Sequence, residues 1–545
     1  MQFTRRSFFP LSAAVIATTP RISYARSASS DHRRQEAYQL RIEAARNERD
    51  QPVPDHVSNG DETTYASRIG NFTKGLPHNE IGEVNANAYT TLLNALESST
   101  MADMEKIVMG ASDPSKQMKL VNPLSGVAFD MEGCDSHALA QPAAPALSSA
   151  EAAGEMVELY WMALLRDVAF TDYSSNALVQ AACDELSKLS NFKGPKINGN
   201  VTPQTLFRGF TAGDTVGPYL SQFMVRPVPY GAQDVDQKIF PYAPGADFLT
   251  DFASFLAVQN GNMPSAAVTY GNRTLLRNPR DLAAWVHVDV LFQAYFNAAN
   301  ILMMPPNASD SLSAGGMGAP ASPANPYNSS KTQAAFGTFG PPFFASMVPE
   351  AAIRALKAVW FEKWYVHRRV RPEEFGGLIH NHLAGKAGYP IHSEALNSAA
   401  VARVKQQNGT ALLPMAFPEG CPLHPSYGAG HATVAGACVT MAKALFDESF
   451  PISNPVVPSA DGQTLVAYTG SDAHQLTVGG ELNKLAANVA IGRNMAGVHY
   501  RSDYAESLRL GEQVAIHILR DHKLTFREDF SGFTFTSFDG EKIAI

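Results

Sequence analysis

Apolar residues recur at helical spacing through most of the chain, and few stretches alternate in the way that strands do. The most apolar stretch, residues 281–303 (DLAAWVHVDVLFQAYFNAANILM), predicts one long helix at the centre of a bundle. Helical periodicity also covers residues 88–96, 150–189, 349–370, 432–447, 481–496 and 503–521. We therefore expect a mainly helical protein.

The segments between these helices differ in character. Residues 31–50 predict a charged helix, and residues 51–85, punctuated by Pro, Asn and Gly, predict an arm or loop over the surface. Residues 304–345 are rich in Pro, Gly, Ser and Asn, so we expect an insertion-type loop at a cleft mouth or a subunit contact. The C-terminal tail alternates and predicts a β-hairpin that turns at Asp539-Gly540.

The N-terminus has the pattern of a targeting segment. Thr4 to Phe9 (TRRSFF) is a twin-arginine pattern, the apolar stretch Leu11 to Ala17 follows it, and Ser23 to Ala25 offers small residues for cleavage. Residues 1–25 therefore predict a Tat-type signal and a periplasmic or secreted protein. No later apolar run has the length of a membrane span.

Charge and cysteine content narrow the function classes. A formal net charge of -8 argues against nucleic acid as the main partner. The four cysteines are too few for a disulfide scaffold and form no C-x-x-C pair. The sequence leaves open whether they are oxidised or are buried thiols; they are Cys134, Cys183, Cys421 and Cys438.

Two cations in KWYVHRRVRP stand eight residues apart. On one helix ended by Pro372, this spacing brings Lys363 and Arg371 back to the same face after two turns, so that both reach one pocket. The alternative is a solvated basic face, because Arg368 and Arg369 are also present.

Two further segments add groups that bind anions. In HPSYGAGH, Gly430 permits close backbone approach, and a helix beginning near His431 would direct its amides at an anion. In GRNMAGVH, Arg493 lies near a helix end and Gly497 redirects the chain before His499. Together with the first pair, these residues predict a cradle for a tetrahedral oxyanion.

The three segments resemble the signature of the vanadium-dependent haloperoxidases and the related acid phosphatases. The longer stretches NPRDLAAWVHVDVLFQAY, WYVHRRVRPEEFGG, CPLHPSYGAGHA and LTVGGELNKLAANVAIGRNMAGVHYRSD are similar to algal bromoperoxidases and their bacterial relatives, and they span residues 278–513. The resemblance implies an all-α fold of two four-helix bundles sharing one core. It also implies one haloperoxidase domain at 86–545, after an N-terminal helix and arm at 26–85, and a homo-oligomer.

The same resemblance implies a vanadate cofactor and the residues that hold it. His499 would bond vanadium directly, and the Gly430 backbone N–H would donate to vanadate. The cations that neutralise the vanadate oxygens would be Lys363, Arg371 and Arg493.

The resemblance also implies roles in the reaction for several residues. His431 would take a proton from incoming peroxide, His424 matches a second histidine typical of bromoperoxidases, and Trp360 falls near the halide site. Lys363 would also polarise the bound peroxide. A supporting carboxylate is expected behind His431 or Arg493, with Asp289 preferred over Asp281.

One position departs from the family pattern. Ala429 stands where the family signature has a serine whose hydroxyl donates to vanadate. Losing one such charge-assisted hydrogen bond weakens binding by about 1.5–3 kcal/mol unless another donor replaces it. A water or the hydroxyl of Ser426 would be such a donor.

The resulting hypothesis is a vanadate-dependent haloperoxidase that oxidises bromide or iodide with hydrogen peroxide to hypohalous acid, which halogenates small organic acceptors. The first alternative is an acid phosphatase in which His499 is the nucleophile. The second is a non-catalytic exported protein that binds oxyanions.

Overall fold

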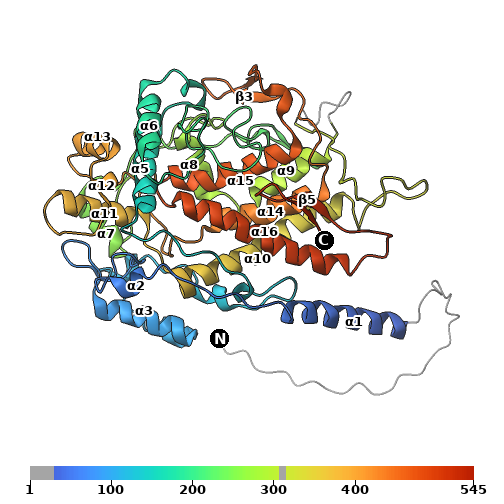
Figure 1. Ribbon diagram of the computed structural model, residues 1–545, viewed down its shortest axis with the longest axis horizontal. Helices are drawn as coiled ribbons and strands as arrows, with labels where there is room; N and C mark the ends of the chain where they lie inside the picture. Colours follow the sequence, from blue (N-terminus) through green and yellow to red (C-terminus); the bar gives the residue numbers. More distant parts are fainter. Residues whose placement is uncertain (1–29, 306–314) are drawn as a thin grey trace, which may run out of the picture. The chain divides into compact units, whose positions relative to one another are not determined.

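The computed structural model describes residues 30–305 and 315–545, so the predicted targeting segment lies outside the described residues. Ser30–Arg49 form helix α1, which belongs to a unit separate from residues 50–545. The larger unit is mostly helical, as expected (Figure 1).

Helices and short antiparallel strand pairs make up this unit. Its first eight helices are α2 (Asp61–Thr64), α3 (Ala86–Ser98), α4 (Met101–Met104), α5 (Ala150–Leu164), α6 (Ala177–Lys188), α7 (Phe252–Gln259), α8 (Pro279–Val288) and α9 (Gln293–Met303). The later helices are α10 (Pro341–Phe361), α11 (Pro372–Leu383), α12 (Ser393–Leu396), α13 (Ala399–Asn408), α14 (Gly430–Leu445), α15 (Val478–Met495) and α16 (Arg501–Lys523). The strand pairs are β1 (Val228–Tyr230) with β2 (Gln233–Val235), β3 (Val456–Pro458) with β4 (Leu465–Ala467), and β5 (Thr534–Thr536) with β6 (Lys542–Ala544).

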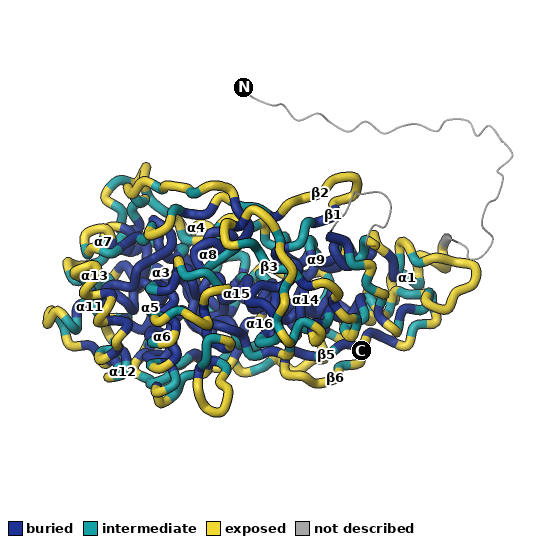
Figure 2. The backbone as a smooth tube through the Cα atoms, turned by 90° about the horizontal axis from the view of Figure 1, so that it is seen from above, coloured by how far each residue is buried: buried dark blue, intermediate teal, exposed yellow. Residues whose placement is uncertain are grey.

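Helix α14 lies at the centre of the helical bundle. It packs against α10, α15 and α16, while α8 covers α15 and α9 lies against α10. Every residue of α14 except His431 is buried, and the backbone of this region is correspondingly dark in Figure 2. The bundle therefore holds the start of α14, with His431, in a fixed place.

Two glycines allow α14 and α16 to approach closely. A Cβ at Gly436 would meet the backbone carbonyl of Leu508, and one at Gly511 would meet that of Thr433. Both positions therefore require a residue without a side chain. This contact brings the middle of α16 against the first half of α14.

The apolar stretch 281–303 is not the single helix that its composition predicts. It forms α8 and α9, and Asp289 ends α8 with extended backbone angles (φ -61°, ψ 146°). The β-branched Val286, Val288 and Val290 around it have low helix propensity. The break directs the Asp289 side chain toward His431.

The prediction that Lys363 and Arg371 share one helix is also wrong. Helix α10 ends at Phe361, one π-helical turn covers Glu362–His367, and Arg368 then adopts a left-handed conformation (φ 42°). Pro372 does not end a helix; it begins α11, because proline's missing N–H is not needed at a first helical position.

Part of the predicted surface arm at 51–85 belongs to the core. Residues 71–76 are buried, and the Phe72 ring packs edge-on against Trp364. Lys74 Nζ lies 2.8 Å from Glu373 Oε1, and the Thr73 hydroxyl donates to Glu374. Burial of these polar partners fixes the segment against the start of α11.

The structure also describes three smaller features. The C-terminal hairpin is confirmed, with Gly540 at φ 87° in its turn. All four cysteines are buried, and none of them forms a disulfide. Among the residues that the structure describes, no helix has the length and apolarity needed to cross a membrane.

Replacing Glu374 tests this buried contact through the pH dependence of stability. Burial raises the pKa of Glu374 from its ordinary 4.5 to about 8, and the nearby Glu373 adds to the rise. Between these values the folded chain keeps a proton that the unfolded chain has lost, so stability falls as pH rises and levels off above pH 8. Glu374→Gln removes this dependence.

We therefore expect the denaturation midpoint of Glu374→Gln to match wild type near about pH 5 and to exceed it near about pH 8.5. Parallel pH profiles for the two proteins would contradict a buried, protonated Glu374.

Candidate functional site

Three cations and a histidine, distant in sequence, meet at the N-terminal end of α14. Lys363 comes from the π-helical turn, Arg371 from the residue before α11, Arg493 from the last turn of α15, and His499 from the link between α15 and α16. All four are buried, with at most 7% of each residue exposed. We call this set, with the first amides of α14 at Gly430, the cradle.

The cations of the cradle have no carboxylate partner. Within the described part of the chain, neither Lys363 nor either arginine of the cradle forms an ion pair. They donate to backbone carbonyls instead: Lys363 to Pro425 and Ser426, Arg371 to His424 and Val498, and Arg493 to Val286. Arg371 also donates to the rings of His424 and His499. Arg493 Nε has no hydrogen-bond partner among the described residues. Buried charges without a counter-charge are destabilising, so this arrangement suits an anion.

The pKa values of Lys363 and Arg493 also reflect the missing counter-charge. Burial, together with the charges of Arg371 and Arg493, holds the pKa of Lys363 well below its usual range, although Asp503 opposes this. Burial lowers the pKa of Arg493 to about 10, against the attraction of Asp289. An anion between these groups would restore both pKa values.

His499 presents one ring nitrogen to the cradle. Its Nδ1 lies 2.8 Å from Asp503 Oδ2, and its Nε2 lies 3.1 Å from Arg371 Nη1. Since Asp503 accepts at Nδ1–H and Arg371 donates at Nε2, the ring is neutral with its lone pair on Nε2. Burial and the Arg371 charge also hold the pKa of His499 well below its usual range. This nitrogen is available to bond a metal.

Asp503 orients His499, although the sequence analysis did not select it. Its carboxylate also accepts from Arg369 Nη1 at 2.8 Å, from the backbone N of Tyr500 and from the Ser426 hydroxyl. Burial acts to raise its pKa, but Arg369 and the hydrogen bond from His499 hold that pKa well below its usual range. The only signal available was its position four residues after His499, within one helical turn.

This network corrects one expectation. The Ser426 hydroxyl donates to Asp503, so it does not replace the donor missing at Ala429. Arg369 extends the network to Glu155, 2.8 Å away, and lies 3.9 Å from the centre of the Tyr500 ring. Sequence reasoning had treated Arg369 only as part of a basic face.

The start of α14 completes the cradle. Ala429 occupies the N-cap position and makes no side-chain capping bond, which leaves amides of the first turn for an anion. His431 Nε2 lies 2.9 Å from Asp289 Oδ1, and 26% of the His431 side chain is exposed. Asp281 instead binds Arg277, at 2.9 Å. The structure thus brings Asp289, not Asp281, behind His431.

Trp360 and His424 form one wall of the cradle. Their ring centres lie 4.8 Å apart, and a Cβ at Gly430 would lie 3.1 Å from the Trp360 ring. Arg371 Nη2 donates to His424 Nδ1 at 2.8 Å, while Trp360 Nε1 donates to the carbonyl of Val121. These contacts bring the site residues expected from the sequence into one region of the fold.

Known proteins are similar to this chain over most of its length. The family domain described as the VCPO second helical-bundle domain matches residues 343–528. A vanadium-dependent bromoperoxidase of Corallina pilulifera is 37% identical over 93% of this chain and 98% of its own length. One of Ascophyllum nodosum is 33% identical over 94% of this chain and 93% of its own length.

A solved structure agrees with these sequence relatives. The homohexameric second vanadate-dependent bromoperoxidase of Ascophyllum nodosum superposes with a TM-score of 0.88 and 30% identity. The superposition covers 99% of this chain and 94% of that one. The similarity therefore extends over both halves of the chain.

Asp503→Asn tests the orientation of His499. The variant loses the charge that pairs with Arg369 and that fixes the Nδ1–H tautomer, so we expect affinity for orthovanadate to fall by about 10- to 100-fold. Titration calorimetry on the metal-free protein measures this. Asp214→Asn, at another buried aspartate that binds Thr211, is the matched control and should leave affinity unchanged. Equal losses in both variants would attribute the effect to general destabilisation.

Proposed function

The chain belongs to the family of vanadium-dependent bromoperoxidases, and from this premise we propose that it oxidises bromide and iodide with hydrogen peroxide. It is a vanadate-dependent haloperoxidase, and vanadate is its cofactor. The product is hypohalous acid, which halogenates small organic acceptors.

One observation carries the assignment of the site. Lys363, Arg371 and Arg493 are buried together without a carboxylate partner among the described residues, beside a histidine whose Nε2 lone pair faces the Arg371 guanidinium. A tetrahedral oxyanion with a metal centre suits both features. Its oxygens accept hydrogen bonds from the cations, and its metal is coordinated by the histidine nitrogen. The residues present therefore fit vanadate.

The residues of the cradle have distinct proposed roles. His499 Nε2 would hold vanadium, and the hydrogen bond that Arg371 now donates to this nitrogen would pass to an oxygen. Lys363 and Arg493 would neutralise further oxygens, and the Gly430 amide would donate from the start of α14. When bound, vanadate supplies Lewis acidity that activates peroxide without a change in oxidation state.

Proton transfer falls to His431. Its Nε2 is bound to Asp289, so Nδ1 is the nitrogen left to take a proton from incoming peroxide. Asp289 would stabilise the imidazolium that results. Lys363 would polarise the bound peroxide, and Trp360 with His424 would line the halide side. Iodide and bromide are easier to oxidise than chloride, and His424 is the histidine expected of bromoperoxidases.

The two alternatives are not favoured. An acid phosphatase with His499 as nucleophile would use a similar cradle, but the relatives that match more than nine-tenths of this chain are bromoperoxidases. A non-catalytic oxyanion-binding protein would leave the His431–Asp289 pair without a role.

Two further properties are proposals. The twin-arginine segment at 1–25 supports export through the Tat pathway to the periplasm or medium. The homohexameric state of the Ascophyllum structure supports a homo-oligomer for this chain.

The function is tested by assaying metal-free protein with peroxide and bromide, with and without orthovanadate. We expect bromination only when orthovanadate is added. His431→Ala should still bind orthovanadate and lose about 10²- to 10⁴-fold in turnover, as removal of a proton-transfer group predicts. Hydrolysis of p-nitrophenyl phosphate with no gain from orthovanadate would contradict the proposal and favour the phosphatase.

Ala429→Ser tests the departure from the family pattern. Because the Ser426 hydroxyl is bound to Asp503, it does not replace the missing donor, and a hydroxyl at 429 should raise orthovanadate affinity about tenfold. Titration of the metal-free variant measures this. Unchanged affinity would show that the oxyanion is already fully satisfied without a side-chain donor at this position.

A further inference from the structure

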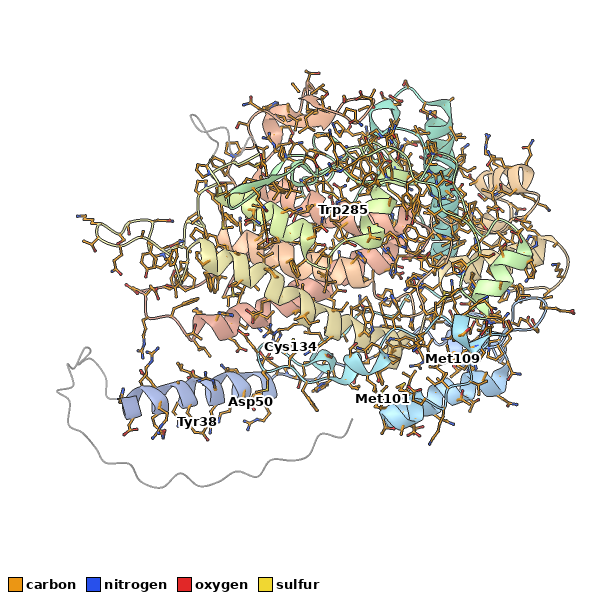
Figure 3. The ribbon with its side chains drawn as sticks, turned by 180° about the vertical axis from the view of Figure 1, so that it is seen from behind. Tyr38, Asp50, Met101, Met109, Cys134 and Trp285 are labelled. Atoms are coloured by element: carbon orange, nitrogen blue, oxygen red, sulfur yellow. The ribbon has the colours of Figure 1, made fainter. Side chains whose placement is uncertain are left out.

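A cavity of about 540 Å³ lies away from the cradle, at the opposite end of α8. Arg277, just before α8 begins, lines the cavity, whereas the cradle contacts α8 through the carbonyl of Val286, which accepts from Arg493. Figure 3 labels Trp285 toward this second end of the helix. The ten residues of α8 span about 15 Å, so the cavity and the cradle are separate sites.

Two hydrogen-bond donors in the lining of the cavity are buried without a partner. Tyr173 and Arg208 are only 4% and 8% exposed, and among the described residues neither the Tyr173 hydroxyl nor Arg208 Nε has a hydrogen-bond partner. The other nitrogens of Arg208 donate to the backbone carbonyls of Asp214, Gly217 and Pro218. A buried donor without an acceptor is destabilising, so a ligand with two acceptor oxygens suits this pair.

The charge of Arg208 also lacks a counter-charge. Within the described part of the chain Arg208 forms no ion pair, and burial holds its pKa below its usual range, although the charge of Asp214 opposes this. The other arginine of the lining, Arg277, is paired with Asp281 at 2.9 Å. Asp472, the one acid among the described lining residues, accepts from a backbone N–H at 2.6 Å and from a tyrosine hydroxyl at 2.8 Å. A carboxylate would therefore pair with Arg208.

Aromatic rings surround the two donors. Phe170 and Tyr219 line the cavity and stack in parallel, with ring centres 4.0 Å apart. The Arg208 guanidinium lies 5.1 Å from the centre of the Tyr219 ring, and the Tyr173 ring lies 6.1 Å from it. The Tyr219 hydroxyl donates to the carbonyl of Phe207 at 2.6 Å, which fixes the ring. A flat apolar ring suits this wall of the cavity.

We propose that this cavity binds an aromatic monocarboxylate as a ligand that the reaction at the cradle does not consume. The two carboxylate oxygens accept from the Arg208 guanidinium and the Tyr173 hydroxyl, and the ring of the ligand lies against the aromatic wall at Tyr219. The volume of the cavity falls within the roughly 300–1,000 Å³ that is typical of small-molecule sites. Binding is independent of vanadate, because the cradle lies at the other end of α8.

Equilibrium dialysis of 2-naphthoate against the full chain loaded with orthovanadate tests the proposal, since the cradle is then occupied. We expect saturable binding with a Kd of about 0.1 mM. The neutral analogue 2-naphthamide should bind at least about tenfold more weakly, because it cannot pair with Arg208. No saturable binding of naphthoate would overturn the proposal, as expected if a second copy of the chain covers the cavity or water satisfies both donors. Binding that orthovanadate abolishes would also overturn it, because the ligand would then occupy the cradle.

Matched variants locate the ligand. Tyr173→Phe removes a hydroxyl that has no partner in the protein, so the fold should be kept while naphthoate affinity falls about five- to tenfold. Tyr295→Phe is the control, because Tyr295 is also buried with an unpartnered hydroxyl but does not line the cavity. Its naphthoate affinity should equal that of the wild type. Equal affinities in Tyr173→Phe and the wild type would overturn the proposal.

A further variant tests the charge. Arg208→Gln should remove the preference for naphthoate over naphthamide, and a preference that persists in the folded variant would contradict the assignment of Arg208. If Arg208→Gln does not fold, the comparison of Tyr173→Phe with Tyr295→Phe still decides. Bromination by Tyr173→Phe with orthovanadate should match the wild type, so this site and the proposed function are tested separately.

Discussion

The structure depends on one electrostatic constraint: three buried cations converge without a carboxylate between them. Lys363, Arg371 and Arg493 bond only neutral partners in the described structure, and burial lowers the pKa of each. Such a cluster is destabilising in the absence of an anion. It persists because the surrounding helices, with α14 at their centre, hold the backbone that each cation comes from. A bound oxyanion neutralises these buried cations, so its binding relieves the destabilisation that they cause.

A second layer of charge lies behind the cradle and is fully paired. Asp503 accepts from His499, Ser426 and Arg369, and Arg369 reaches on to Glu155. The paired groups behind the cradle fix the tautomer and orientation of His499. The cations of the cradle, which have no carboxylate partner, attract the oxyanion. Close packing of α14 on α16 through Gly436 and Gly511 brings the two layers together. Local stability and ligand affinity are therefore supplied by different residues.

The sequence predicted the cradle residues and most helices, because both leave local signals. Gly497, at φ 83°, does redirect the chain before His499 as its position suggested. The breaks at Asp289 and after Phe361 were missed because tertiary partners, His431 and the carbonyls around Lys363, override periodicity there. Asp503 and the burial of residues 71–76 rest on contacts between segments far apart in the chain, which no single-sequence pattern reports.

The central claim is that His499 Nε2 and the unpaired cations form one binding site for vanadate. A crystal structure of the full chain with orthovanadate bound tests it most directly. The account predicts a single tetrahedral or expanded oxyanion within bonding distance of Nε2, with Lys363, Arg371 and Arg493 all donating to its oxygens and Asp503 still bound to Nδ1. An oxyanion held elsewhere, or one in the cradle with no bond to His499, would contradict it.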